Sequence, residues 1–264
     1  MAPTNAFAFT KWYLDGVTPA GDTWIAYWTR LKWRGLPVQW HSIGRTGSSG
    51  LLRASSSLSR VDPPAWHDGQ LTWQAPALGV ALDYRPEADP FSRTLFHDEH
   101  GSVEWCCEAP AARATLRSES GPTSEGLGYA ECIHFTVPPW RLPLHELRWG
   151  RWIAADASHS MVWIDWQGPA PRSWAVLNGR DLVAPAVTDD SVVAEGSRLV
   201  VSDRQPLRSR VLADLIRGIP GLTPLMPKSI LALRETRWLG HGLLTRDGQP
   251  PVPGRSLSEY VVLG

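Results

Sequence analysis

Proline and glycine interrupt this chain at short intervals, and that spacing limits the structures that the chain can form. The 264 residues include 23 prolines and 23 glycines. Proline removes a backbone donor and breaks helices, whereas glycine favours turns. The sequence therefore leaves little room for long helices and favours strands joined by turns.

Strand and turn signals fill the chain between these breaks. Trp24, Ala26 and Trp28 occupy alternate positions of residues 24–29, which is the period-2 pattern of a strand. Two-residue turn signals recur beside segments rich in strand-forming residues. They are Asp15-Gly16, Asp68-Gly69, Asn178-Gly179 and Asp247-Gly248.

One segment, 206–216, has helical periodicity. Leu207, Val211 and Leu215 recur on one face, while arginines take the other. Gly218 and Pro220 would end the helix. We predict one short helix here, covering the open end of a β-barrel.

Two similar hairpins suggest that the chain contains two related halves. Trp12 is followed after 12 positions by Trp24-Ile25, and Trp152 is followed after 11 positions by Trp163-Ile164. The polar stretch 117–126 lies between the hairpins and is rich in turn-forming residues. We therefore predict an all-β chain of two antiparallel β-barrel or β-sandwich halves, with domains over 1–120 and 121–264.

Charge, hydropathy and cysteine content exclude several classes of protein. Lys+Arg and Asp+Glu both number 26, so no basic surface is expected for nucleic acid. No run of 18 apolar residues and no signal peptide occur, which predicts no transmembrane segment. Three cysteines cannot form a disulfide framework. These features together predict a cytoplasmic protein.

The chain contains 15 tryptophans, which have two interpretations. They can fill the cores of sheets, or a cluster of them can line a cavity for an apolar ligand. Both interpretations remain open from sequence. The candidate ligand-contacting residues are Trp12, Trp24, Trp28, Tyr129, Trp149 and Trp163.

The segment 128–137 contains the principal catalytic candidate. As a strand, it places Tyr129, Glu131 and Ile133 on one face, so that a carboxyl group lies in an aromatic and aliphatic row. Burial in such a row raises the pKa of a carboxyl, so that the carboxyl stays protonated at neutral pH, as a general acid must. The alternative is a buried ion pair of Glu131 with Arg148 or Arg151, which would lower that pKa.

Two other charged residues join Glu131 as catalytic candidates. Arg151 shares a strand face with Trp149, and Asp165 shares one with Trp163. The alternative role of Asp165 is structural, as the acceptor of a hydrogen bond from a tryptophan or arginine of a neighbouring strand.

Several short motifs resemble the carotenoid 1,2-hydratase, tocopherol cyclase and AttH-like group. Trp12-Tyr13-Leu14-Asp15-Gly16 resembles its Trp-Tyr-x-Asp opening, and Gly128-Tyr129-Ala130-Glu131 resembles the Tyr-Ala-Glu element of the cyclases. Trp149-Gly150 is similar to the Trp-Gly that follows that element. Residues 235–239 and 254–261 are similar to AttH-like C-termini. The Asp-His-Asn triplet of the carotenoid hydratases is absent.

The resemblance implies two lipocalin-like barrels and a hydrophobic, often isoprenoid, small-molecule ligand. In the hydratase and cyclase branches an acid protonates a carbon–carbon double bond, and Glu131 matches the position of that acid. Tryptophan faces would stabilise the resulting cation. The implied function is a cofactor-independent hydratase, cyclase or isomerase for an apolar substrate. The alternative is a non-catalytic lipocalin-like protein that binds an apolar ligand.

The sequence gives no sign of a nucleotide cofactor or a metal. It has no Gly-x-Gly-x-x-Gly pattern and no phosphate-binding loop. The segment His97-Asp98-Glu99-His100 holds residues that can bind metals, but the following Gly101 favours a polar turn. We predict that the protein uses no cofactor and no metal.

Overall fold

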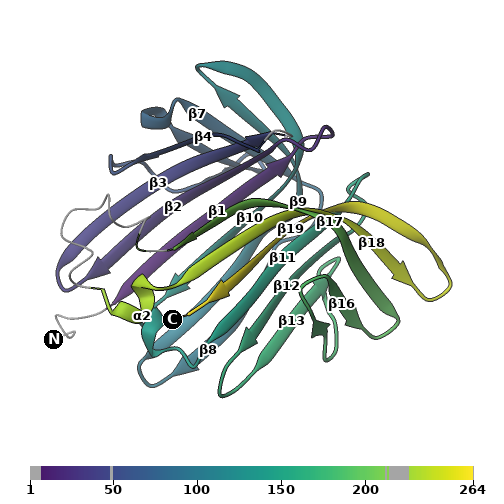
Figure 1. Ribbon diagram of the computed structural model, residues 1–264. Coiled ribbons are helices and arrows are strands. Elements are labelled where there is room, and N and C mark those ends of the chain that lie inside the picture. Colours follow the sequence, from purple (N-terminus) through teal and green to yellow (C-terminus); the bar gives the residue numbers. More distant parts are fainter. Residues whose placement is uncertain (1–6, 48–49, 212, 214–225, 264) are drawn as a thin grey trace. The chain divides into compact units, whose positions relative to one another are not determined.

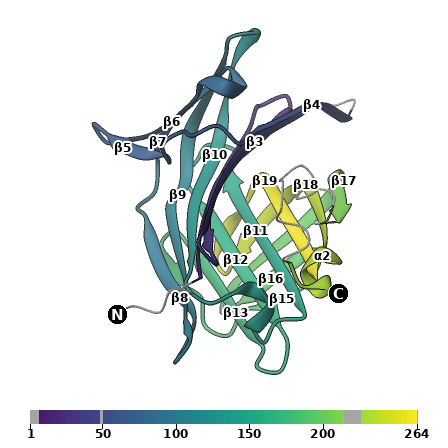
Figure 2. The same cartoon turned by 90° about the vertical axis from the view of Figure 1, so that its left-hand side faces the viewer.

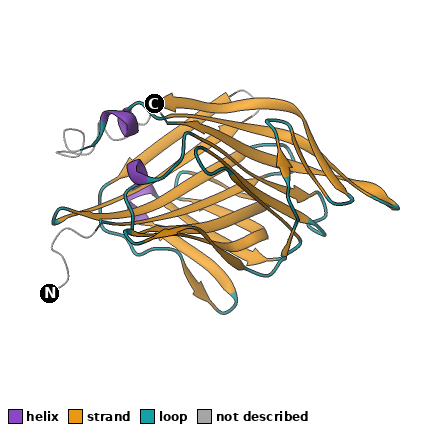
Figure 3. Ribbon diagram, turned by 90° about the horizontal axis from the view of Figure 1, so that it is seen from below, coloured by secondary structure: helices purple, strands orange, loops and turns teal. Residues whose placement is uncertain are grey.

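Strands dominate the protein. The computed structural model describes residues 7–47, 50–211, 213 and 226–263 (Figure 1). About 70% of it is strand and 5% helix (Figure 3). The strands form two antiparallel sheets, so the all-β fold predicted from the sequence is confirmed. Among the described residues, no helix has the length and apolarity needed to cross a membrane.

The chain divides into two compact units, Met1–Pro139 and Trp140–Gly264. Two units were expected, but the predicted boundary between residues 120 and 121 is wrong. The stretch 117–126 closes a hairpin within the first sheet, in which Ser118 pairs with Gly121. Its polar residues mark a tight turn between two long strands and not a linker between domains.

The first sheet has ten strands. The strands that come first and last along the chain, β1 and β10, lie side by side in the middle of the sheet (Figure 1). Its strands are β1 (Ala8–Val17), β2 (Thr23–Trp33), β3 (Leu36–Gly47), β4 (Gly50–Ser57), β5 (Ala65–His67), β6 (Gln70–Ala75), β7 (Val80–Pro86), β8 (Phe91–Asp98), β9 (Gly101–Ser118) and β10 (Gly121–Phe135). The order across the sheet is β4-β3-β2-β1-β10-β9-β7-β6-β5, with β8 paired to β9.

The second sheet has nine strands in a matching order, β14-β13-β12-β11-β19-β18-β17-β16-β15. Its strands are β11 (Glu146–Ala154), β12 (Ser160–Gln167), β13 (Arg172–Leu177), β14 (Arg180–Asp181), β15 (Ala186–Val187), β16 (Ser191–Ala194), β17 (Ser197–Val211), β18 (Arg234–Arg246) and β19 (Gln249–Val262). The described helical elements are the short 3-10 turns η1 (Pro76–Leu78) and η2 (Pro139–Arg141) and the helix α2 (Lys228–Leu231).

The two sheets are topological counterparts. When β8 is set aside, each strand of the first sheet has an equivalent at the same place in the second. In both, the first strand pairs with the second on one side and with the last on the other. This shared order supports the duplication that the two hairpins suggested.

A glycine packed under a tryptophan recurs at equivalent places. Gly16 of β1 lies opposite Trp24 of β2, and Gly150 of β11 lies opposite Trp163 of β12. A Cβ atom on either glycine would overlap the facing indole ring. Only glycine leaves room for the indole to lie across the first strand, so both hairpins depend on it.

The repeat expected from the two tryptophan hairpins is therefore correct only for the second strand of each hairpin, β2 and β12. The dipeptides Trp24-Ile25 and Trp163-Ile164 occupy equivalent positions, but Trp12 and Trp152 do not. Trp12 pairs with Trp28, whereas Trp152 pairs with Met161. The similar spacing of these first tryptophans is a coincidence of sequence.

Three of the four predicted turns are confirmed. Asp68-Gly69 and Asn178-Gly179 have positive φ at both positions, 49° and 76° in the first pair and 50° and 77° in the second. That conformation suits two-residue hairpins. Asp247-Gly248 joins β18 to β19. The turn predicted at Asp15-Gly16 is wrong, because both residues lie inside β1.

The helix predicted over 206–216 is wrong for residues 206–211, which belong to β17. Ala213 is helical, and residues 212 and 214–216 lie outside the described residues. Arg210 pairs with Glu235 of β18 and forms an ion pair with it at 3.0 Å. Pairing with a neighbouring strand thus overrides the local helical periodicity.

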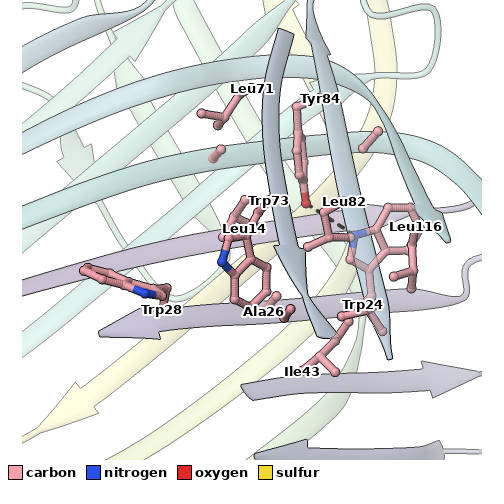
Figure 4. Packing of buried hydrophobic residues seen from close by; sticks show 14 of the residues in the cluster. Leu14, Trp24, Ala26, Trp28, Ile43, Leu71, Trp73, Leu82, Tyr84 and Leu116 are labelled. Carbon is pink, nitrogen blue, oxygen red and sulfur yellow. Dashed lines mark hydrogen bonds between the residues drawn. The ribbon is translucent and has the colours of Figure 1, made fainter. Parts of the chain in front are cut away.

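Each sheet curls around its own apolar core. In the first unit, Ile43 of β3 and Trp73 of β6 belong to one buried cluster, although five strands separate β3 from β6 in the sheet (Figures 2 and 4). Trp24 also lies in this cluster and donates a hydrogen bond from its indole nitrogen to Tyr84 at 3.3 Å (Figure 4). The second unit has a separate cluster that includes Trp152.

The paired glycines give a direct test of this packing. We expect Gly16→Ala and Gly150→Ala each to destabilise the protein by about 1–3 kcal/mol, because each added methyl forces an indole out of place. The control is Gly44→Ala in β3, where a Cβ would meet nothing within 4 Å. Thermal unfolding should show lower melting temperatures for the first two variants and an unchanged one for the control. Equal effects in all three would contradict the packing described.

Candidate active site

One face of the first sheet gathers buried polar and aromatic side chains from three central strands. Tyr13 of β1 pairs with Glu131 of β10 and with Tyr27 of β2, while Asp15 pairs with Tyr129. Directly paired residues share a face of an antiparallel sheet. These five residues, all buried, define what we term the Glu131 face.

Two aromatic donors hold the carboxyl group of Glu131, which is 3% exposed. The Tyr129 hydroxyl donates to Oε2 at 2.6 Å, and the Trp105 indole nitrogen donates to the same oxygen at 2.7 Å. Tyr129 and Trp105 are both fully buried. The prediction that Glu131 lies on a strand face with Tyr129 is confirmed by the pairing of β10 with β1.

Tyr129 acts in this arrangement as a hydrogen-bond donor. Burial raises the pKa of Tyr129 well above its ordinary value, and the neighbouring Cys107 thiol and Glu131 carboxyl raise it further. Burial likewise raises the pKa of Cys107. Both groups therefore keep their protons at neutral pH, and neither can serve as a ready base.

Aromatic rings surround the carboxyl group. The Tyr13 ring lies 6.1 Å from that of Tyr129 and 5.6 Å from that of Tyr27, measured between centroids. The Trp105 ring meets Phe91 edge-on at 5.1 Å. Ring faces of this kind carry negative partial charge and attract cations.

The structure places three predicted ligand-contacting residues on the opposite face of the same sheet. Trp12 pairs with Cys132, the residue after Glu131, so Trp12 and its neighbour Trp28 face away from the carboxyl. Trp24 shares their face and packs in the core cluster with Trp28 (Figure 4). Tyr129, another member of the predicted set, donates a hydrogen bond to Glu131.

The remaining candidates lie in the second unit, on two different faces of its sheet. Arg151 and Trp149 alternate with Gly150, which pairs with Trp163. Trp163 and Asp165 therefore lie on the face opposite to that of Arg151. The structure does not bring Arg151 and Asp165 together.

Asp165 accepts hydrogen bonds within its own unit. Its Oδ1 accepts from Ser173 at 2.7 Å and from Gln167 at 2.9 Å. Its Oδ2 lies 3.5 Å from Arg148, which also binds Asp189 at 2.7 Å. Asp165 therefore accepts hydrogen bonds, as the structural alternative expects, but from Ser173 and Gln167 instead of a tryptophan or an arginine.

A buried ionic cluster accompanies Arg151 on its face, and the sequence did not reveal it. Arg237 is 1% exposed and forms ion pairs with Glu235, at 3.0 Å, and with Glu259. Glu259 pairs with Trp149 across β19 and β11. Arg151 is itself fully buried and donates from Nη1 to the carbonyl of Arg255 at 3.3 Å.

Sequence reasoning also missed Tyr13, Tyr27 and Trp105 as neighbours of Glu131. The one sequence feature that could have identified Tyr13 as a site residue is its place in the Trp-Tyr-x-Asp motif. Its place beside Glu131 depends on the register between β1 and β10, which are separated by most of the first unit.

The described residues offer no group of three or more His, Cys, Asp or Glu side chains that could hold a metal ion. The segment 97–100 closes the turn between β8 and β9, as predicted. The Asp98 carboxylate accepts there from the backbone amides of His100 and Gly101.

Comparisons with known proteins show similarity in fold. No family model and no curated protein matches the sequence. The crystal structure of CghA with Sch210972 matches with a TM-score of 0.60 at 12% identity, over 98% of this chain and 89% of that one. An AttH-like protein from Nitrosomonas europaea matches with a TM-score of 0.55 at 12% identity, over 98% and 95%. Kievitone hydratase from Nectria haematococca matches with a TM-score of 0.53 at 10% identity, over 98% and 89%.

These similarities span nearly the whole of each chain, so both sheets share the fold of these structures. They agree with the fold that the AttH-like motifs implied. At such low identity they bear on the fold alone.

The ionic cluster of the second unit predicts a strong dependence on Arg237. We expect Arg237→Met to lower stability by about 3–5 kcal/mol, because it leaves the mostly buried Glu259 carboxylate without its guanidinium and removes one of the two arginines that pair with Glu235. The control is Arg117→Met, which breaks a pair between Arg117 and Asp83 in which the arginine is 57% exposed. That change should cost about 1 kcal/mol at most. Similar unfolding midpoints for both variants in urea would refute the prediction.

Proposed function

We propose that this protein is a cofactor-independent enzyme that hydrates, cyclises or isomerises a hydrophobic, isoprenoid- or polyene-like small molecule by acid catalysis, with Glu131 as the proton donor. The observation that carries the proposal is the buried Glu131 carboxyl, held at one oxygen by Tyr129 and Trp105. An apolar substrate suits such a site because the transfer of apolar surface from water into apolar surroundings is favourable.

The two hydrogen bonds favour transfer of the proton from Glu131 to the substrate. Both donors contact Oε2, so the carboxyl proton is carried on Oε1. Transfer of that proton to a carbon of the substrate leaves a carboxylate, and donors already aimed at Oε2 stabilise the developing negative charge. Tyr129 and Trp105 thus hold the acid in position and favour its ionised product.

The steps after protonation need no cofactor. Protonation of a carbon–carbon double bond leaves a cation, which the rings of Tyr13 and Tyr27 stabilise. In hydration, water adds to the cation and its surplus proton returns to Glu131. In cyclisation a hydroxyl captures the cation and its proton returns to Glu131, or a second double bond captures it and a carbon next to the new cation loses a proton to Glu131. In isomerisation a neighbouring carbon loses a proton to Glu131.

The similar structures support this class of reaction by their names alone. Kievitone hydratase is named for a hydration, and CghA was crystallised with the small molecule Sch210972. The resemblance of Gly128-Tyr129-Ala130-Glu131 to the Tyr-Ala-Glu element of the cyclases supports the same chemistry.

One observation favours the second candidate, a protein that binds an apolar ligand without chemistry. Hydrogen bonds donated to a carboxyl stabilise its charged form, and an ionised Glu131 has no proton to give. The two candidates therefore differ in whether Glu131 transfers a proton to the bound molecule.

Deuterium transfer to three apolar probes, farnesol, retinol and lycopene, tests the proposal. We would incubate the protein with each probe in heavy water and measure carbon-bound deuterium and added water by mass spectrometry. We expect Glu131→Gln to reduce the rate by about 100-fold or more, the usual contribution of a general acid. The control, Glu125→Gln, changes an exposed carboxylate on the same strand and should retain the wild-type rate.

Two results would contradict the proposal. Saturable binding of these probes without any deuterium transfer would favour the binding protein. A melting temperature for Glu131→Gln that falls by the equivalent of about 3–5 kcal/mol would identify Glu131 as half of a buried ion pair, and an ionised Glu131 has no proton to give.

A further inference from the structure

A buried histidine in the first unit plays no part in the site described above. His41 of β3 is 0% exposed. Neither of its ring nitrogens has a hydrogen-bond partner among the residues that the structure describes. A polar group buried in this way is costly, and in native proteins it signals an occupant or a function. Burial also lowers the pKa of His41, so that its ring is neutral at neutral pH.

His41 lies on the concave side of the first sheet, opposite to the Glu131 face. It pairs with Trp28 of β2 and with Ser57 of β4. Trp28 belongs to the core cluster around which the sheet curls (Figure 4). The ring of Trp73, from the same cluster, meets the imidazole edge-on with 6.1 Å between centroids. Two indoles therefore flank an imidazole with unused hydrogen-bonding capacity.

The same two indoles hold a segment of chain beside this histidine. Between β4 and β5, the carbonyl of Val61 accepts from the Trp28 indole nitrogen at 2.9 Å and from Gln39. The carbonyl of Asp62 accepts from the Trp73 indole nitrogen at 3.2 Å. Side-chain donors and backbone carbonyls make these bonds, Val61 also packs against the core cluster, and residues 58–64 belong to no strand.

We propose that the concave side of the first sheet holds a second small-molecule site, in which a neutral, flat, largely apolar ligand bonds His41 through a single hydroxyl or carbonyl group. The flat part of the ligand rests on Trp28 and Trp73. The proposal does not depend on catalysis at Glu131, because the two sites lie on opposite faces of the sheet.

The chemistry of His41 selects this class of ligand. A neutral imidazole offers one donor and one acceptor, which a hydroxyl can satisfy together and a carbonyl can satisfy in part. A carboxylate would have to leave water for an apolar site without a positive charge on His41, which is unfavourable. The indole rings provide the contact area for a planar apolar body.

Three matched probes test the proposal: 2-naphthol, naphthalene and 2-naphthoate. They share one ring system and differ in the polar group. Titration calorimetry should give a Kd for 2-naphthol at least about tenfold below those of naphthalene and 2-naphthoate. His41→Leu should remove this advantage and leave the affinity for naphthalene unchanged. The control His67→Leu, at an exposed histidine of β5, should preserve it.

Further measurements separate this site from the Glu131 face and from a purely structural role. Glu131→Gln should leave the Kd for 2-naphthol unchanged, so either proposal can fail alone. If His41→Leu does not fold, His41→Gln retains a donor and an acceptor and should keep the preference. In the wild-type protein, 2-naphthol but not naphthalene should shift the nitrogen-15 resonances of the His41 ring. Equal affinities for the three probes, or a preference that survives His41→Leu, would overturn the proposal.

Discussion

The pairing of the first strand of each unit with its last strand is the constraint on which the structure depends. β1 pairs with β10 and β11 pairs with β19, so the two ends of each unit meet in the middle of its sheet. In the first unit this pairing sets Tyr13 beside Glu131. In the second it sets Trp149 beside Glu259. The Glu131 face and the ionic cluster of the second unit thus both depend on pairing between strands that are far apart in the sequence.

Strand alternation then gives the first sheet two chemically different sides. On β10, Glu131 points to the face with the tyrosines, and its neighbour Cys132 points to the concave side with Trp12 and Trp28. Trp24, Trp28 and Trp73 fill the core on one side. The other side holds the carboxyl and its donors, one of which is Trp105. A single set of central strands thereby keeps the buried Glu131 carboxyl apart from the apolar core.

The sequence predicted what depends on near neighbours. Alternation placed Tyr129 with Glu131, and the signal at Asn178-Gly179 identified a turn with positive φ. The predictions failed where contacts between residues far apart in the sequence determine the local structure. The glycine of Asp15-Gly16 accommodates the Trp24 ring instead of forming a turn, and residues 206–211 pair with β18 instead of coiling. The contact between Tyr129 and Glu131 followed from one strand, but that between Trp105 and Glu131 required the register between β9 and β10.

The central claim is that Glu131 acts as a proton donor, which requires the buried carboxyl to hold its proton at neutral pH. Infrared difference spectroscopy of the wild-type protein against Glu131→Gln measures this state directly. If Glu131 is protonated, we expect the variant to lose the C=O stretching band of a protonated carboxyl. We also expect this band to shift when the wild-type protein is transferred to heavy water. Loss of a carboxylate band alone would mean that Glu131 is ionised at rest, and would contradict the assignment of Glu131 as the acid.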